Sequence, residues 1–218
     1  MGKRFTAAEA ISRINERGIL LVFPINNRPL PLSLWSEFLP KTRMVWDWND
    51  DSAGQPVHDM WGLMKRLSDC REVVYSKWYQ GRATFFSREL FAAMLRLRCF
   101  PSDPRRGLSS TARTLLEVLE NNSPLSTRRL KEMTELQGKV NEPVYSRAMK
   151  ELFFCLLIVG FGEVDDGAFP SLAVGATELL YDDLWRQADA MSERKAQSFV
   201  DRLMPDSSHF RRFFEKTK

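Results

Sequence analysis

The chain has 218 residues, of which 44% are hydrophobic and 28% charged, and its formal net charge is +4. This composition is typical of a globular protein and excludes an intrinsically disordered one, while the small basic excess permits an anionic partner without requiring one. The three scattered cysteines argue against a disulfide framework or a structural zinc site, and no apolar stretch is long enough to span a membrane. We therefore expect a cytoplasmic protein without membrane association.

The first hundred residues predict helices around a β-hairpin. Thr6 to Glu9 has the sequence of a capping box, and apolar residues follow at helical spacing as far as Gly18. A buried strand over 19–24 and a brief helix around 34–38 come next, and a longer helix begins at Pro56. Residues 73–86 alternate around Gln80-Gly81 as a hairpin does, and a helix is predicted over 89–98.

The second unit has the clearest pattern in the sequence. Helices are predicted over about 110–121, from Ser126, and from Pro143, which stands in a first turn where proline is tolerated. Two apolar segments then flank Asp165-Asp166-Gly167, and Asp-Gly between such segments is a strong hairpin signal. Three helices followed by a hairpin are the order of a winged helix-turn-helix.

These patterns together predict a mainly α fold with small β-hairpins, of the α+β class, with two helix-and-hairpin units in tandem. We expect an N-terminal unit over 1–100, interpreted as a degenerate winged helix, a winged-helix domain over 108–181, and C-terminal helices over 182–218. Between the first two lies a proline- and glycine-containing segment with the composition of a linker.

A winged helix that reads DNA places its third helix in the major groove. With Val144, Ala148 and Leu152 facing the core, the outward side chains of that helix are Ser146, Arg147 and Lys150, with Tyr145 beside them. The start of the preceding helix offers further groups suited to phosphates, namely Ser126, Thr127, Arg128, Arg129 and Lys131. An ordinary solvated helix face also favours Arg and Lys, so these residues alone leave both interpretations open.

The two hairpins differ in charge. The wing tip of the second unit carries Glu163, Asp165 and Asp166, which would repel a phosphate. The first hairpin instead gathers cations and rings around its turn, namely Lys77, Trp78, Tyr79 and Arg82. Such cations neutralise phosphates and such rings stack on exposed bases, although alternate residues of a hairpin are also expected in the core.

Signals for catalysis are weak. The two histidines, His58 and His209, are not spaced as metal ligands, and the chain has neither a G-x-S-x-G elbow nor a phosphate-binding glycine loop. We therefore predict no catalytic residue, no metal and no cofactor.

The segments SPLSTRRLKEMTEL and PVYSRAMKELFFCLLIVGFGEVDDG resemble a winged helix of the AlkZ (YcaQ) type, and SLWSEF with VVYSKWYQGRATFFSREL is similar to shorter relatives of that family. The family consists of DNA glycosylases built from tandem winged helices, so the resemblance implies duplex DNA, intact or damaged, as the partner. Active members carry Gln-x-Asp or Gln-x-Gln in the N-terminal winged helix. The corresponding region here, 23–27, lacks such a pair, and Gln187-Ala188-Asp189 stands in a C-terminal helix. The resemblance thus implies a DNA-binding relative without glycosylase activity.

Two alternatives remain open. One is an active glycosylase that uses other residues, such as Asn26 or Asn27, in place of the motif. The other is a protein-interaction module, since winged helices also serve as packing surfaces, and its mark would be an exposed apolar patch around Trp35, Trp46 and Trp48. The sequence sets no oligomeric state.

Overall fold

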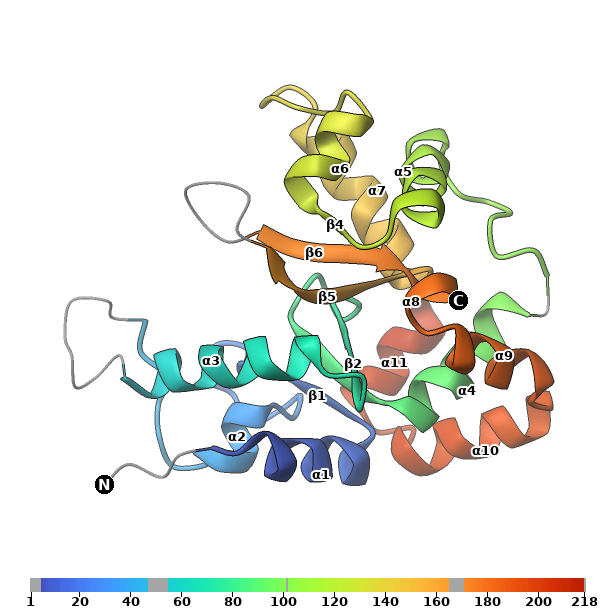
Figure 1. The fold of residues 1–218 in the computed structure, drawn as a ribbon. Coiled ribbons are helices and arrows are strands. Elements are labelled where there is room, and N and C mark those ends of the chain that lie inside the picture. Colours follow the sequence, from blue (N-terminus) through green and yellow to red (C-terminus); the bar gives the residue numbers. More distant parts are fainter. Residues whose placement is uncertain (1–4, 47–54, 101, 165–170, 218) are drawn as a thin grey trace.

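The computed structural model describes residues 5–46, 55–100, 102–164 and 171–217 (Figure 1). Its N-terminal unit runs helix, strand, helix, helix, hairpin. The elements are α1 (Ala7–Arg17), β1 (Ile19–Leu21), α2 (Leu34–Phe38), α3 (Gln55–Asp69), β2 (Val73–Ser76) and β3 (Thr84–Ser87). The predicted capping box opens α1, because Thr6 accepts a hydrogen bond from the Glu9 backbone and donates backbone and hydroxyl hydrogens to the Glu9 carboxylate.

The second unit repeats this order. Its elements are α5 (Ser110–Asn122), β4 (Leu125–Ser126), α6 (Thr127–Met133), α7 (Glu142–Phe154), β5 (Ile158–Val164) and β6 (Ser171–Ala176). In each unit the short first strand pairs with the last strand of the hairpin, β1 with β3 and β4 with β6. The predicted α+β class, mainly helical with antiparallel hairpins, is confirmed. The residues that link β5 to β6, including Asp165 and Asp166 of the predicted acidic wing tip, lie outside the described residues.

The two units share one six-stranded sheet with the order β1-β3-β2-β5-β6-β4. The two halves of this order mirror each other, because β1, β3 and β2 of the first unit correspond to β4, β6 and β5 of the second. The strand order is therefore symmetric about the β2–β5 pair. At that junction Tyr75 lies opposite Gly160. A Cβ atom at Gly160 would lie 2.3 Å from Cδ1 of Tyr75, so the glycine leaves the space that the tyrosine ring occupies.

Alternate residues of the first unit's strands face two different cores, as the period of a strand requires. Those that face α1–α3 include Leu20, Val22, Tyr75 and Phe85. Those that face the other core, which also contains the second unit, include Ile19, Leu21, Val74 and Phe86. The hydrophobic effect therefore holds the sheet between two helical layers.

The remaining helices are α4 (Arg88–Cys99), α8 (Thr177–Leu180), α9 (Asp182–Ala190), α10 (Glu193–Leu203) and α11 (His209–Lys216). They contribute to the core that faces Ile19 and Val74, where α4 packs against α9 and α10. Figure 1 shows α10 at the opposite end of the molecule from α6. Among the described residues, no helix has both the length and the apolar character needed to cross a membrane.

Candidate nucleic-acid interface

The start of α6 is tied into the sheet. Ser126 belongs to β4, is buried, and accepts a hydrogen bond from the Arg129 backbone at 3.0 Å as the N-cap of α6. The neighbouring carbonyl of Thr127 lies 3.5 Å from the Tyr145 hydroxyl, which donates to it. The predicted N-cap at Ser126 is thus confirmed. As a phosphate contact Ser126 is misplaced, because its hydroxyl is buried and already serves the helix.

The cations of α6 have carboxylate partners within the protein. Arg128 and Arg129 both pair with Glu132, at 3.2 Å and 3.1 Å, and their hydrogen bonds hold the pKa of the Glu132 carboxyl below its usual range. Lys131 pairs with Glu142 at 2.6 Å and likewise lowers the pKa of that carboxyl. Exposed pairs of this kind contribute little to stability, about 0–1 kcal/mol, so a phosphate can displace them at small cost.

The core face of α7 differs from the predicted one. Tyr145, Ala148, Met149 and Leu152 are buried, whereas Val144 is 44% exposed. Tyr145 is therefore wrong as an outward DNA contact. Its ring packs inward under the Lys131 ammonium, 4.5 Å from the ring centroid, and burial, with the Glu142 charge as the smaller cause, raises the pKa of its hydroxyl.

The outward face of α7 carries Arg147 and Lys150, one helical turn apart and both exposed. Glu151, next to Lys150, binds instead the backbone and hydroxyl of Ser109 at the start of α5, at 2.8 Å and 2.7 Å. Within the part of the chain that the structure describes, neither Arg147 nor Lys150 forms an ion pair. Their charges are therefore available to an outside anion.

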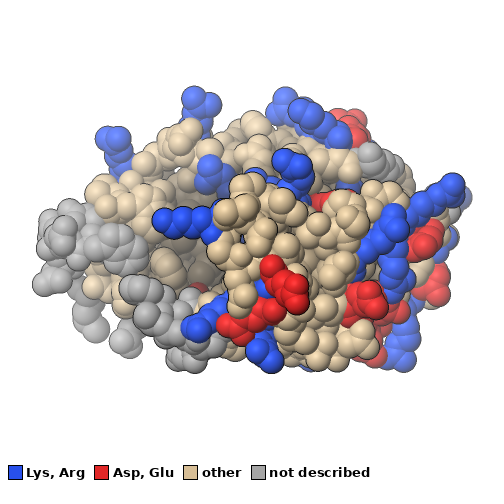
Figure 2. Space-filling view, turned by 90° about the horizontal axis from the view of Figure 1, so that it is seen from above, with Lys and Arg blue, Asp and Glu red and all other residues tan. Residues whose placement is uncertain are grey.

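Ser146 is half-buried, and its hydroxyl donates to Glu142 at 3.2 Å. A hollow in this unit is lined by residues of α6, of the segment that follows and of β6, including Thr127, Arg128, Lys131, Gly138 and Ser171. Figure 2, which views the molecule from above, shows basic side chains spread over this side and acidic ones interspersed among them. The surface is therefore mixed in charge, and Arg147 and Lys150 are cations on it that form no ion pair among the described residues.

The aromatic rings of the first hairpin are not accessible from solvent. Trp78 is fully buried and Tyr79 is 4% exposed, so neither can stack on a base. Their rings pack on α11, with Phe213 at 4.9 Å from each ring centroid. Trp78 and Tyr79 are thus wrong as DNA contacts, because the turn folds back onto a helix distant in the sequence. Lys77 is half-buried with a pKa lowered by desolvation, and Arg82 is exposed.

The region in which an active glycosylase would carry its motif forms a pocket of about 420 Å³, lined in part by Phe23, Asn26, Trp46 and Arg82. The side chain of Asn27, also in its lining, donates to the Met44 carbonyl at 3.0 Å and accepts from the Met44 amide at 2.7 Å. The side-chain amide of Asn27 thus links its own segment to the backbone of Met44. No group of His, Cys, Asp and Glu among the described residues is arranged to hold a metal ion.

The described tryptophans of the predicted apolar docking patch do not share one exposed surface. Trp35 is 3% exposed and donates its indole hydrogen to the Thr42 carbonyl at 2.8 Å. Trp46 is 51% exposed, and its ring lies 5.1 Å from that of Phe23. Trp48 lies outside the described residues.

Comparison with known proteins gives a family. The family described as AlkZ related has a model that matches residues 5–205, almost the whole chain. No curated protein and no solved structure matches the chain.

Proposed function

The chain belongs to the AlkZ-related family, and from this membership we propose that it binds duplex DNA, intact or damaged, through a winged helix formed by α5–α7 and the β5–β6 hairpin. The order of these elements supports the proposal, since helix, strand, helix, helix and hairpin is the plan of a winged helix. On this plan α7 is the helix that enters the major groove.

The observation that carries the proposal is that two cations on α7 form no ion pair with the residues that the structure describes. Arg147 and Lys150 share one exposed side of the helix, while nearby carboxylates are engaged by Lys131, Ser146 and Ser109. Phosphates gain most from cations that have no internal partner to lose. Arg147 and Lys150 are accordingly the principal contacts, and the paired Arg128, Arg129 and Lys131 are secondary ones.

We assign the protein no glycosylase chemistry. The side chain of Asn27 is committed to the Met44 backbone, and the region around it contains no Gln-x-Asp or Gln-x-Gln pair. Gln187 and Asp189, which do form such a pair, are exposed on α9, outside the N-terminal unit that carries the motif in active members. We therefore expect the protein to bind DNA without releasing a base from it.

Fluorescence anisotropy tests the binding. The purified protein is titrated into labelled intact duplex, duplex with an abasic site, and single-stranded DNA, over a series of salt concentrations. We expect saturable binding to duplex that weakens steeply with salt. Absence of binding even at low salt would overturn the proposal and favour a protein-interaction role.

Base release is tested in parallel: alkylated duplex is incubated with the protein and then treated with alkali. Strand cleavage above the protein-free control would show base release and refute the non-catalytic assignment.

A further inference from the structure

The turn between β2 and β3 is held against the C-terminal helix α11. The ring of Tyr79 lies 5.0 Å from that of Phe210 and 4.9 Å from that of Phe213, and Trp78 meets Phe213 edge-on. At the tip, Gln80 and Gly81 have positive φ angles of 54° and 73°, and nothing lies within 4 Å of a Cβ built on Gly81. The turn is therefore fixed at its base and open to solvent at its tip.

Two arginines from distant parts of the sequence stand on the two segments that pack together at this junction. Arg82 follows the tip of the turn, and Arg212 stands on α11 between the two phenylalanines that pack on Tyr79; both are exposed. Both positive charges act on the Tyr79 hydroxyl, where they oppose the rise of its pKa that burial causes. Arg82 and Arg212 thus stand on the two segments that pack together at Tyr79, since the Arg82 amide also donates to the Tyr79 carbonyl at 2.9 Å.

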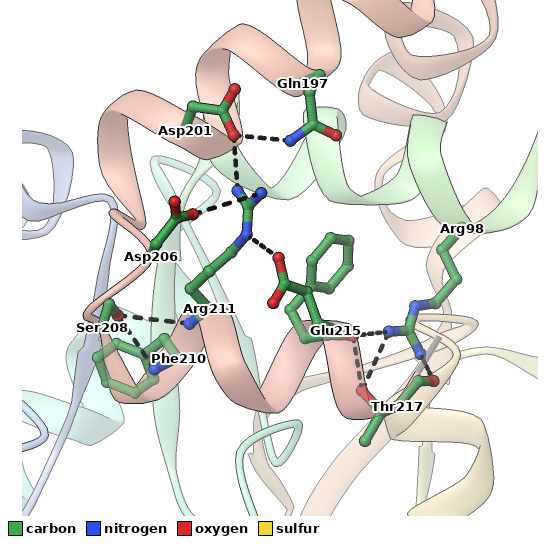
Figure 3. Close-up of polar contacts among 10 residues, drawn as sticks. Arg98, Gln197, Asp201, Asp206, Ser208, Phe210, Arg211, Glu215 and Thr217 are labelled. Carbon is green, nitrogen blue, oxygen red and sulfur yellow. Dashed lines mark hydrogen bonds and ion pairs between the residues drawn. The ribbon is translucent and has the colours of Figure 1, made fainter.

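The carboxylates near Arg212 are bound to its neighbour, Arg211. Figure 3 shows Arg211 pointing between Asp201, Asp206 and Glu215, at 2.8, 3.8 and 2.6 Å. The side chain of Arg211 is only 11% exposed, whereas the three carboxylates around it are more than half exposed. Arg212 points elsewhere, to the Ser207 carbonyl at 3.4 Å. Neither Arg82 nor Arg212 has a carboxylate partner in the segments that the structure describes.

We propose that Arg82 and Arg212 form a second phosphate-binding site for duplex DNA, separate from the one on α7. Guanidinium groups bind phosphate through paired N–H donors, and here two of them are supplied by a turn and a helix that aromatic packing keeps together. Both guanidinium groups are exposed, and the nearby carboxylates pair with Arg211 rather than with Arg82 or Arg212. The inference rests on the proposed function, since it assumes that the protein binds DNA.

The test compares the salt dependence of duplex binding by wild type and by the Arg82→Ala/Arg212→Ala variant. Each lost phosphate contact lowers the slope of log K against log salt by about 0.9, so we expect a decrease of about 1.8. Arg82→Lys/Arg212→Lys keeps both charges and should keep most of the slope. As a control of equal charge, Arg194→Ala/Lys195→Ala removes two exposed cations from α10.

The outcomes separate the two proposals. If wild type binds no DNA, the proposed function fails. If wild type binds and the Arg82→Ala/Arg212→Ala variant keeps the full slope, only the second site is overturned. Both substituted residues are exposed, and unchanged thermal unfolding by circular dichroism would show that a lost contact, not a lost fold, lowers the slope.

Discussion

Removing the two unpaired cations of α7 tests the interface most directly. Arg147→Ala/Lys150→Ala deletes two exposed side chains that form no ion pair among the described residues, so the fold should be unaffected. Two phosphate contacts account for about 1.8 units of the slope of log K against log salt. Between 50 and 200 mM salt, wild type should therefore lose about 12-fold more affinity than the variant. Anisotropy titrations with one labelled duplex measure both slopes.

The matched control for this experiment is again Arg194→Ala/Lys195→Ala, which changes the net charge equally but lies on α10, at the other end of the molecule from α6 (Figure 1). It should lower affinity only through the long-range field, with a slope close to that of wild type. Equal slopes for wild type and the α7 variant would refute the reasoning that unpaired cations carry the interface. Equal decreases of the slope in the α7 variant and in the α10 control would show that the slope depends on net charge alone.

Three further predictions concern single residues. Ser126→Ala removes an N-cap and should lower the free energy of unfolding in urea by about 1 kcal/mol while the salt slope of DNA binding stays unchanged; a lower slope would restore Ser126 as a phosphate contact. Arg98→Met removes the side chain that donates to the Phe154 and Phe214 carbonyls at 2.9 and 3.1 Å and to Thr217 (Figure 3 shows the contact with Thr217). It should cost about 2–3 kcal/mol in the same assay, whereas a cost near zero would show that these bonds are dispensable. Burial raises the pKa of Tyr181 from 10.0 to about 12, so the folded state holds this proton more tightly than the unfolded state. The associated stability is present below pH 10 and is lost as the pH rises towards 12; urea unfolding across this range should show a decline that is smaller in Tyr181→Phe.

The sequence predicted helices and hairpins well because each depends on nearby residues. The capping box at Thr6 and the N-cap at Ser126 are examples. On α7 the predicted burial of Ala148 and Leu152 is confirmed, but the prediction was wrong for Val144 and Tyr145, because both positions fit helical spacing with Ala148. The packing on α6 and the Lys131 ammonium over the ring select the tyrosine as the core residue.

Other features depended on contacts that no local pattern contains. The burial of Trp78 against α11, and the position of Arg212 beside the first hairpin, arise from residues at opposite ends of the chain. The pairing of β2 with β5 depends on Tyr75 and Gly160, which are also far apart in the sequence. By contrast, the pairing of Arg128 with Glu132 follows from their spacing of four residues on a helix, so this neutralisation was within reach of the sequence.

The shared sheet ties the two proposed phosphate sites together. Arg82 lies in the turn between β2 and β3, α7 precedes β5 in the chain, and β2 and β5 are hydrogen-bonded neighbours. Domains joined only by a linker move independently, whereas strands of one sheet share backbone hydrogen bonds and a core, so here the spacing of the two sites is fixed. A duplex that contacts both sites must then match this spacing, either as straight DNA or by bending. Bending has a cost that is lower at flexible or damaged positions, so a rigid pair of sites would favour such DNA without reading its bases.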